Sequence, residues 1–356
     1  MKKTLIAVAA LAATGAFAQN VTVSGTLDAT YRSGKTETTA GTTANTTRIS
    51  KDGIGTTGFT LSGSEDLGGG LKADFLVETN FNAADTATEG SGGTYGTGQS
   101  FVGVSGSFGS VKLGAPNAPT LTVQGARGAS FSTKDAGRVS LGAGGYSTLM
   151  GLAVTRFDSS IGYTSPNFSG FSFALLYSPK SDDGTTPVAG ALSDVGLFYA
   201  NGPIAAGVSK FAREIGSGGT AGGSGNAGTA TAAVGSKNDL TSYYVSYDFK
   251  FAKFTLGGHS YKATDATGTD TADNAGMNLA ADVPLSSALT LTANIQKLDD
   301  KLVGNVDSTM TGLGVQYALS KRSTTYARYI IEKADNGGAA VVKDASRLLV
   351  GLRHNF

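Results

Sequence analysis

The residues that could give this chain its chemistry are fixed charges rather than nucleophiles. Segment 116–155 carries three basic residues, Arg127, Lys134 and Arg138, against one acidic residue, Asp135. Rings of Arg or Lys around a narrow aqueous passage favour anions, and a guanidinium stays charged across physiological pH. This segment therefore predicts an anion-preferring constriction if it folds into such a passage. The alternative is that its charges are solvated or paired with neighbouring acids.

Further charges recur on one face of segments in which polar and apolar residues alternate. Successive side chains of a strand point to opposite faces of the sheet, so alternate residues share a face. A slip of one residue would exchange the two faces. We expect the polar face to line the same passage, and Asp28 is one of the charges on it. The other charged residues expected on this face, which would form the wall of the lumen, are Arg32, Lys72, Asp74, Glu78, Lys112, Arg156, Asp158 and Arg328.

Catalytic chemistry has few candidate residues. The chain has no cysteine, which excludes thiolate metal sites and cysteine nucleophiles, and only two histidines, His259 and His354, to act as a general base. The string GIGTTG at 53–58 fits G-x-G-x-x-G, but the pattern after it is that of a strand rather than a helix. It is interpreted as a loop-to-strand transition. We expect no catalysis, no cofactor and no metal site.

The composition excludes several classes of protein. The 356 residues include 28 Lys+Arg and 27 Asp+Glu, for a net charge of +1, whereas nucleic-acid-binding domains usually carry a basic excess. We therefore expect no nucleic-acid partner. The 52 glycines come with only 7 prolines and no G-X-Y period, which excludes collagen. A glycine-rich, all-β protein remains.

The first 18 residues have the three parts of a secretory signal peptide. Lys2 and Lys3 give a positive start, residues 5–13 an apolar centre, and Ala16-Phe17-Ala18 an A-x-A cleavage site. We expect cleavage before Gln19, which leaves residues 19–356 as one exported domain. No other stretch approaches the ~20 apolar residues of a membrane-spanning helix.

Alternation with period two dominates the rest of the chain. In the first strand Val21, Val23, Leu27 and Tyr31 share one face, while Thr22, Asp28 and Arg32 share the other. Sixteen segments of about 9–12 residues show this pattern, close to the ~9–11 residues of a strand that crosses a bilayer. Short connections alternate with long ones, which are expected near 33–53, 82–98, 116–155, 180–190, 213–238, 264–274, 300–307 and 335–344.

This pattern is typical of a transmembrane β-barrel. In hydrocarbon every backbone polar group must pair within the protein, so a spanning sheet must close on itself. An apolar outer face and a polar inner face then follow, and sixteen strands leave a water-filled interior. We predict a 16-stranded antiparallel barrel.

Several motifs resemble one family. They are GSEDLGGGLKADF (63–75), FVGVSGSFGSVKLG (101–114), SIGYTSPNFSGFSF (160–173), YALSKRSTTYARY (317–329) and VGLRHNF (350–356). Together with the signal sequence they are similar to the general, Gram-negative porins of β-proteobacteria. The resemblance implies a homotrimer in the outer membrane, in contact with lipid and lipopolysaccharide. It also implies that the third loop, 116–155, folds into the lumen, and that Phe356 is the signal read by the barrel-assembly machinery.

The resulting hypothesis is a general diffusion porin that passes ions and small hydrophilic solutes and leans towards anions. Its constriction would hold Arg127, Lys134, Asp135 and Arg138. Two alternatives stay open: an exported β protein without a pore, such as a surface adhesin, and an outer-membrane barrel enzyme.

Overall fold

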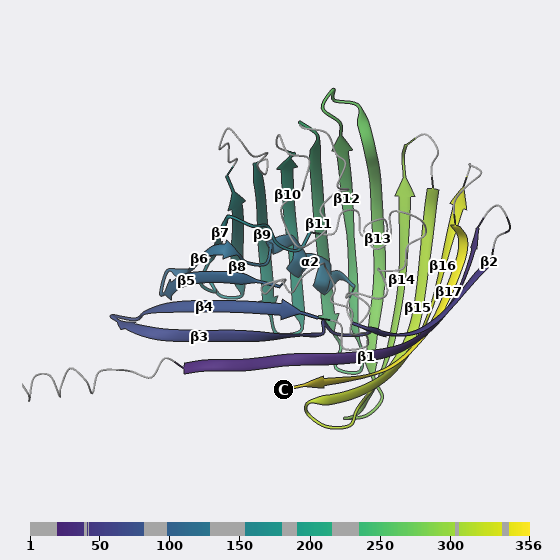
Figure 1. The fold of residues 1–356 in the computed structure, drawn as a ribbon, viewed down its shortest axis with the longest axis horizontal. Helices are drawn as coiled ribbons and strands as arrows, with labels where there is room; N and C mark the ends of the chain where they lie inside the picture. Colours follow the sequence, from purple (N-terminus) through teal and green to yellow (C-terminus); the bar gives the residue numbers. More distant parts are fainter. Residues whose placement is uncertain are drawn as a thin grey trace, which may run out of the picture.

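The computed structural model describes residues 20–38, 41, 43–81, 98–128, 154–179, 191–215, 235–302, 306–336 and 342–356. The predicted signal peptide, and Lys134, Asp135 and Arg138 of the predicted constriction, lie outside these residues. The described chain is almost entirely antiparallel sheet (Figure 1). No helix in it is long and apolar enough to span a membrane.

Seventeen strand segments make up this sheet. They are β1 (Asn20–Thr38), β2 (Thr43–Lys51), β3 (Gly58–Gly68), β4 (Leu71–Asn80), β5 (Ser100–Gly106), β6 (Gly109–Ala115), β7 (Ser160–Thr164), β8 (Phe171–Ser178), β9 (Leu192–Asn201), β10 (Ile204–Glu214), β11 (Lys237–Asp248), β12 (Lys253–Thr264), β13 (Asp270–Pro284), β14 (Leu289–Asp300), β15 (Val306–Ala318), β16 (Ser323–Asn336) and β17 (Val342–Asn355).

The sheet closes into a barrel of sixteen strands. From β3 to β17 each strand pairs with the next, and β17 pairs with β1. Segments β2 and β3 both pair with β1, β2 along Ala29–Glu37 and β3 along Asn20–Thr26, so they are two halves of one strand. At the seam, Gly25 and Phe356 exchange two backbone hydrogen bonds of 3.0 Å. The predicted fold is confirmed.

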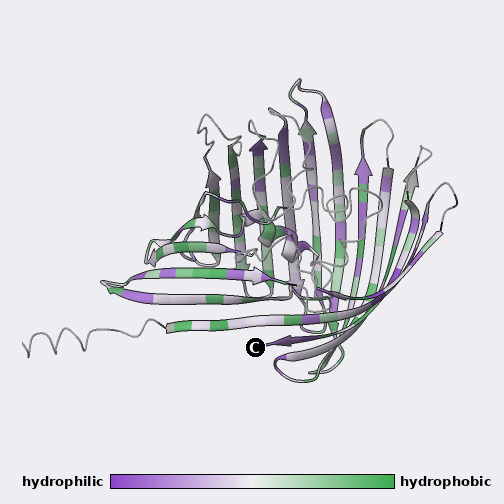
Figure 2. Ribbon diagram, in the orientation of Figure 1, coloured by the Kyte–Doolittle hydropathy of each residue, from purple (hydrophilic) through white to green (hydrophobic). Residues whose placement is uncertain are grey.

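The two faces differ as the alternation predicted. On β1 the side chains of Val23 and Leu27 are exposed on the outer surface, 61% and 39% respectively, while Asp28, Thr30 and Arg32 are buried on the inner side. Figure 2 shows hydrophobic and hydrophilic residues alternating along the strands. The apolar face is the one that lipid solvates, and the polar face surrounds the lumen.

Short turns join the strands at one end of the barrel. In the turn after β3, Gly69 and Gly70 have φ angles of +61° and +80°, a region that side chains with a Cβ rarely adopt. The run DLGGG therefore reverses the chain within two residues. Another short connection, residues 165–170, joins β7 to β8.

Two predicted long connections are wrong in extent. Segment 33–53 is mostly strand, because β1 continues to Thr38 and β2 begins at Thr43. Likewise β13 begins at Asp270, inside the predicted loop 264–274. Both stretches are rich in polar residues on both faces. Backbone pairing continues there without an apolar face, so the alternation signal is lost before the sheet ends.

In the described part of the predicted loop 116–155, a helix, α2 (Pro119–Arg127), follows β6. No helical pattern was predicted here, because nine residues give only about two and a half turns of periodicity. Pro119 occupies the first turn, where its missing N–H costs nothing, and Gly128 follows the last residue.

Candidate functional site

Helix α2 lies inside the barrel, against the inner faces of β8–β12 (Figure 1). Its partners on that wall, Asp194, Ser209 and His259, are buried, whereas residues of the opposite face such as Val195 and Leu256 are exposed to the outside. Because α2 contacts the first set, it occupies the lumen. The third loop therefore enters the barrel, at least over the helix.

The first turn of α2 is fixed by a carboxylate from the wall. The backbone N–H of Thr120 donates to Asp194 Oδ2 at 2.9 Å, and Thr120 Oγ1 lies 2.7 Å from Asp194 Oδ1 and 2.9 Å from Ser209 Oγ. The residue before the helix, Ala118, provides no side-chain cap. Asp194 of β9 takes over that role, since an acceptor at a helix N-terminus satisfies free N–H groups and suits the helix dipole.

The last residue of α2, Arg127, points at the wall. Its Nη1 lies 2.9 Å from His259 Nδ1, its carbonyl accepts a 2.6 Å hydrogen bond from Asn278 Nδ2, and the residue is only 1% exposed. A guanidinium has only donors, so His259 Nδ1 accepts, and its Nε2 faces Asn274 Oδ1 at 3.2 Å. Arg127 thus fastens the helix to β12 and β13.

Apolar side chains beneath the helix complete the anchor. Phe157, in the segment that returns to β7, stacks on Phe211 of β10 with ring centroids 5.4 Å apart, and Ala118 N–H donates to Thr155 O at 2.8 Å. The cluster comprises Ala118, Val154, Phe157, Leu176, Leu192, Phe211, Leu240, Tyr261 and Ala263. The loop is thus packed against the wall at both described ends.

A loss of the Asp194 anchor should loosen the constriction. Asp194→Ala removes the acceptor for Thr120 N–H, and a buried donor left without a partner costs about 1–3 kcal/mol. We expect noisier single-channel current and a lower free energy of unfolding in urea. Asp239→Ala, on the outer face of β11 two strands away, is the matched control. Equal current noise in both variants would contradict the anchoring role.

On another part of the wall the chain itself turns into the lumen. Between β2 and β3, residues 52–57 leave the sheet and lie over the inner face of β1. Asp28 Oδ2 accepts hydrogen bonds of 2.7 Å from the N–H groups of Ile54 and Gly55, and Asp28 O accepts one of 3.3 Å from Asp52 N–H. We call residues 52–57 the inward turn. GIGTTG is therefore a turn followed by a strand, as predicted.

The carboxylate of Asp28 is also bound from β16. The hydroxyl of Tyr326 donates a hydrogen bond to Asp28 Oδ1, and the hydroxyl oxygens of Tyr326 and Thr30 lie 2.6 Å apart. Thr57 Oγ1 accepts from Asp28 N–H at 3.0 Å. The side chain of Asp28 therefore joins β1, β16 and the inward turn, and it adds to the backbone contacts that Asp52 and Thr57 make with Asp28.

Arginines dominate the wall around the inward turn. Arg328 Nη1 donates to Gly53 O at 3.2 Å, and the stem of Arg328 crosses Gly314, where an added Cβ would lie 2.8 Å from Arg328 Cγ. Arg347 forms a 2.8 Å ion pair with Glu332, and both side chains are buried. By strand register, Arg32 pairs with Arg48 and Arg353 with Asp28 on the same face.

The two inward structures lie on opposite sides of the lumen. Helix α2 is centred on β9–β12, and the inward turn lies over β1, β16 and β17. In a closed ring of sixteen strands these positions are separated by about half the circumference. Helix α2 on one side and an arginine-rich wall on the other therefore face each other across the interior of the barrel.

The other predicted wall residues lie between these two sides. Lys72, Asp74 and Glu78 are on the inner face of β4 and Lys112 on that of β6. Arg156 and Asp158 belong to the segment before β7 rather than to a strand. Burial lowers the pKa of Arg156 below the usual value for arginine, and the charges of Glu78 and Asp158 act in the opposite direction.

Several lumen residues were absent from the predicted set. Arg347 and Arg353 alternate with apolar residues on β17, so the period-two pattern was sufficient to find them. Glu332 and Asp194 are recognised only by their partners, which lie 15 and 74 residues away along the chain. Such contacts leave no local signal in the sequence.

The histidines do not form a catalytic group. His259 is held between Arg127 and Asn274, and His354 Nδ1 lies 2.9 Å from Ser323 Oγ at the turn between β16 and β17. No cluster of potential metal ligands occurs among the described residues.

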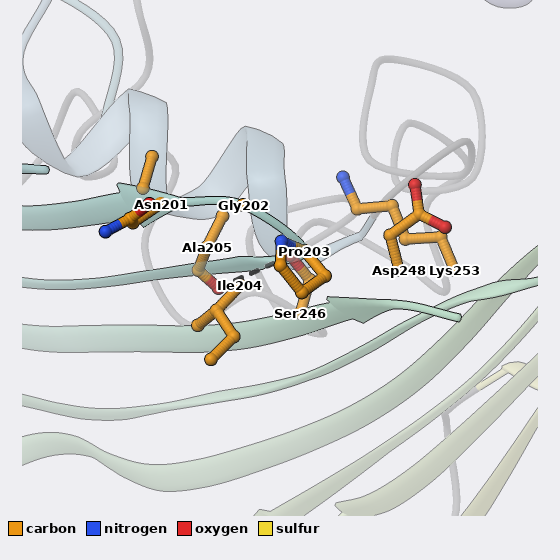
Figure 3. A pocket seen from close by; sticks show the side chains of 9 residues that line it. Asn201, Gly202, Pro203, Ile204, Ala205, Ser246, Asp248 and Lys253 are labelled. Atoms are coloured by element: carbon orange, nitrogen blue, oxygen red, sulfur yellow. Dashed lines mark hydrogen bonds between the residues drawn. The ribbon is translucent and has the colours of Figure 1, made fainter. Parts of the chain in front are cut away.

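A shallow concavity of about 310 Å³ lies at the short-turn end of β9–β12 (Figure 3). Asp248 and Lys253 line it as a cross-strand pair, and Ser246 Oγ donates to Ala205 O at 3.3 Å within it. These contacts belong to the ends of neighbouring strands and converge on no common point. This concavity is not part of the constriction.

Comparison with known proteins identifies relatives along the whole length of the chain. A family model described as "Gram-negative porin" matches residues 4–337. Outer membrane porin protein 32 of Delftia acidovorans is 29% identical, with 100% of each chain covered. The anion-selective porin from Comamonas acidovorans superposes with a TM-score of 0.76 at 24% identity, covering 95% of this chain and 100% of that one. In vitro folded OmpT of Vibrio cholerae, in its trimer form, superposes with a TM-score of 0.62 at 17% identity, covering 95% and 100%.

Proposed function

The chain belongs to the Gram-negative porin family, and we propose that its lumen forms an anion-preferring passage between α2 and the inward turn. It is a channel of the bacterial outer membrane and not an enzyme. The general function is passive diffusion of small solutes. The proposal concerns which solutes pass more easily and which residues decide it.

One observation carries the ion preference. Among the described side chains, the inner faces of β1, β2, β16 and β17 hold five arginines against two carboxylates, Asp28 and Glu332. An excess of fixed positive charge along an aqueous passage attracts anions and repels cations. The arginines are Arg32, Arg48, Arg328, Arg347 and Arg353.

Arg127 has a different role in this proposal from the one its sequence position suggested. Its guanidinium faces His259 and the wall, so it positions α2 rather than attracting the permeating ion. Arg32 and Arg328, also in the predicted set, remain candidates for direct action on the ion. Lys134, Asp135 and Arg138 stay predictions from the sequence.

The ion preference is testable by the zero-current potential in a planar lipid bilayer under a KCl gradient. We expect the sign of the zero-current potential to be that of an anion-preferring channel. Arg32→Gln should lower the anion-to-cation permeability ratio by roughly twofold to fivefold, because a unit charge at about 4 Å in water is worth ~1 kcal/mol. Lys210→Gln on the outer face removes the same charge and should change nothing. A cation-signed potential in the unmodified protein would overturn the anion preference.

We propose a homotrimer as the assembled form. The resemblance to trimeric porins supports it, and a solved relative is described in a trimer form. Current steps that open and close in threes would test it in the same recordings. Contacts with lipopolysaccharide, and recognition of Phe356 by the barrel-assembly machinery, remain part of the proposal.

A further inference from the structure

A second concavity is lined by residues of β1 and β3–β6, and by no residue of α2 and none of the five wall arginines. Its volume is about 510 Å³, within the ~300–1,000 Å³ typical of small-molecule sites. Val102, Val111 and Leu113 are exposed on the lipid side, and the lining residues that alternate with them, such as Phe101, Ser110 and Lys112, face the lumen. The residues that matter here are Ser62, Ser64, Asp74, Leu76, Ser110 and Lys112.

Two opposite charges face this concavity with a gap between them. Asp74 of β4 and Lys112 of β6 both pair with Gly103 of β5, so they lie in one row across three strands. Neighbouring strands are about 4.8 Å apart, which places the two Cα atoms roughly 10 Å from each other. Gly103 has no side chain, so the stem of Lys112 passes close to it: an added Cβ would lie 3.3 Å from Lys112 Cγ. Phe101 and Ser105 of β5 lie on either side of this row on the same face.

Each charge is held in place by a partner of its own. Ser105 Oγ donates to Asp74 Oδ2 at 2.6 Å, and Lys112 Nζ lies over the Phe101 ring, 4.7 Å from its centroid. The charge of Asp74 acts on Lys112, yet the described contacts of these two residues include no direct ion pair within 4.0 Å. A carboxylate and an ammonium are thus fixed at the two ends of a solvent-accessible gap.

We propose that this concavity is a binding subsite for small zwitterionic solutes of the amino-acid type, an inference that rests on the open pore of the proposed function. The carboxylate of such a solute would meet Lys112 and the hydroxyl of Ser110. Its ammonium would meet Asp74 and the hydroxyls of Ser62 and Ser64, with its side chain over Leu76. A monoanion would be repelled by Asp74, and a monocation by Lys112. A neutral sugar would find the Phe101 ring already covered by Lys112.

The test is block of the KCl current through single reconstituted trimers by glutamine. We expect transient, concentration-dependent interruptions with glutamine, and weaker ones with propionate, ethanolamine or glucose at equal concentration. Asp74→Asn and Lys112→Gln should each weaken glutamine binding by about tenfold or more, as expected when a charge-assisted hydrogen bond is removed. Lys72→Gln, at the next inner position of β4, is the control and should leave glutamine binding unchanged.

The outcomes separate the subsite from the pore. Normal KCl conductance without glutamine block, or block that survives both substitutions in barrels of normal heat-modifiable migration, overturns the subsite and leaves the pore intact. Block by propionate as strong as by glutamine, lost with Lys112→Gln but not with Asp74→Asn, also overturns it and indicates a simple anion site. Absence of KCl conductance overturns the proposed function itself.

Discussion

Asp28→Ala should open the passage and strengthen its preference for anions. The substitution removes the acceptor for Ile54 N–H, Gly55 N–H and the Tyr326 hydroxyl, and hydrogen bonds to a charged group are each worth about 1.5–3 kcal/mol. No other described side-chain acceptor binds the N–H groups of Ile54 and Gly55. We therefore expect the inward turn to leave the wall, with a larger single-channel conductance and more current noise.

Selectivity should change in the same variant for a separate reason. Asp28 is one of the two carboxylates among five arginines, and it pairs in register with Arg353. Its removal leaves one more uncompensated positive charge in the passage. Because a nearby unit charge is worth ~1 kcal/mol in water, the anion-to-cation permeability ratio should rise roughly twofold to fivefold.

Asp28→Asn is the matched control for this prediction. The amide oxygen can still accept from Ile54 or Gly55, so the turn should be held better and the conductance should change less. The negative charge is lost in both variants, so the rise in anion preference should be similar. An unchanged conductance and zero-current potential in Asp28→Ala would show that the turn is held by its other contacts and lies outside the ion path.

The barrel could be predicted from the sequence because its physical cause repeats along the chain. Lipid on one face and water on the other impose the same alternation on every spanning strand, so residues such as Val23 and Asp28 each carry the signal. The lumen assignments of Arg32 and Arg328 follow from that alternation alone. The continuation of β1 to Thr38 could not be predicted in this way, because both faces of the strand are polar there.

The constriction was less accessible because it is made by single, non-repeating contacts. The short helix α2 is stable where it stands because Asp194, His259 and Asn278 bind its two ends, and these residues lie far from it along the chain. Arg127 was expected in the ion path on the basis of its charge. Its orientation depends on His259, 132 residues away, which no local pattern reports.

Glu332→Met should be among the most destabilising single substitutions in the wall. Glu332 and Arg347 are 1% and 3% exposed, with Nη2 and Oε2 2.8 Å apart. Removing one partner of a buried ion pair leaves the other charge uncompensated and typically costs about 3–5 kcal/mol. The free energy of unfolding, measured in urea on barrels refolded into lipid vesicles, should fall by that amount. The anion preference should also rise, because Arg347 loses its counter-charge.

The double variant Glu332→Met/Arg347→Met should recover most of this loss. Met310 and Ile330 lie beside the pair within the buried apolar cluster that also contains Leu298 and Leu349, so two methionines extend an existing apolar surface. Replacing both members of a buried pair by apolar residues is often neutral. The exposed pair of Lys210 and Asp239, 55% and 50% exposed, is the control, and breaking it should cost no more than about 1 kcal/mol. If Glu332→Met costs no more than the Asp239 substitution, water in the lumen screens Arg347. In that case the wall arginines act on the passage as hydrated charges rather than through a desolvated pair.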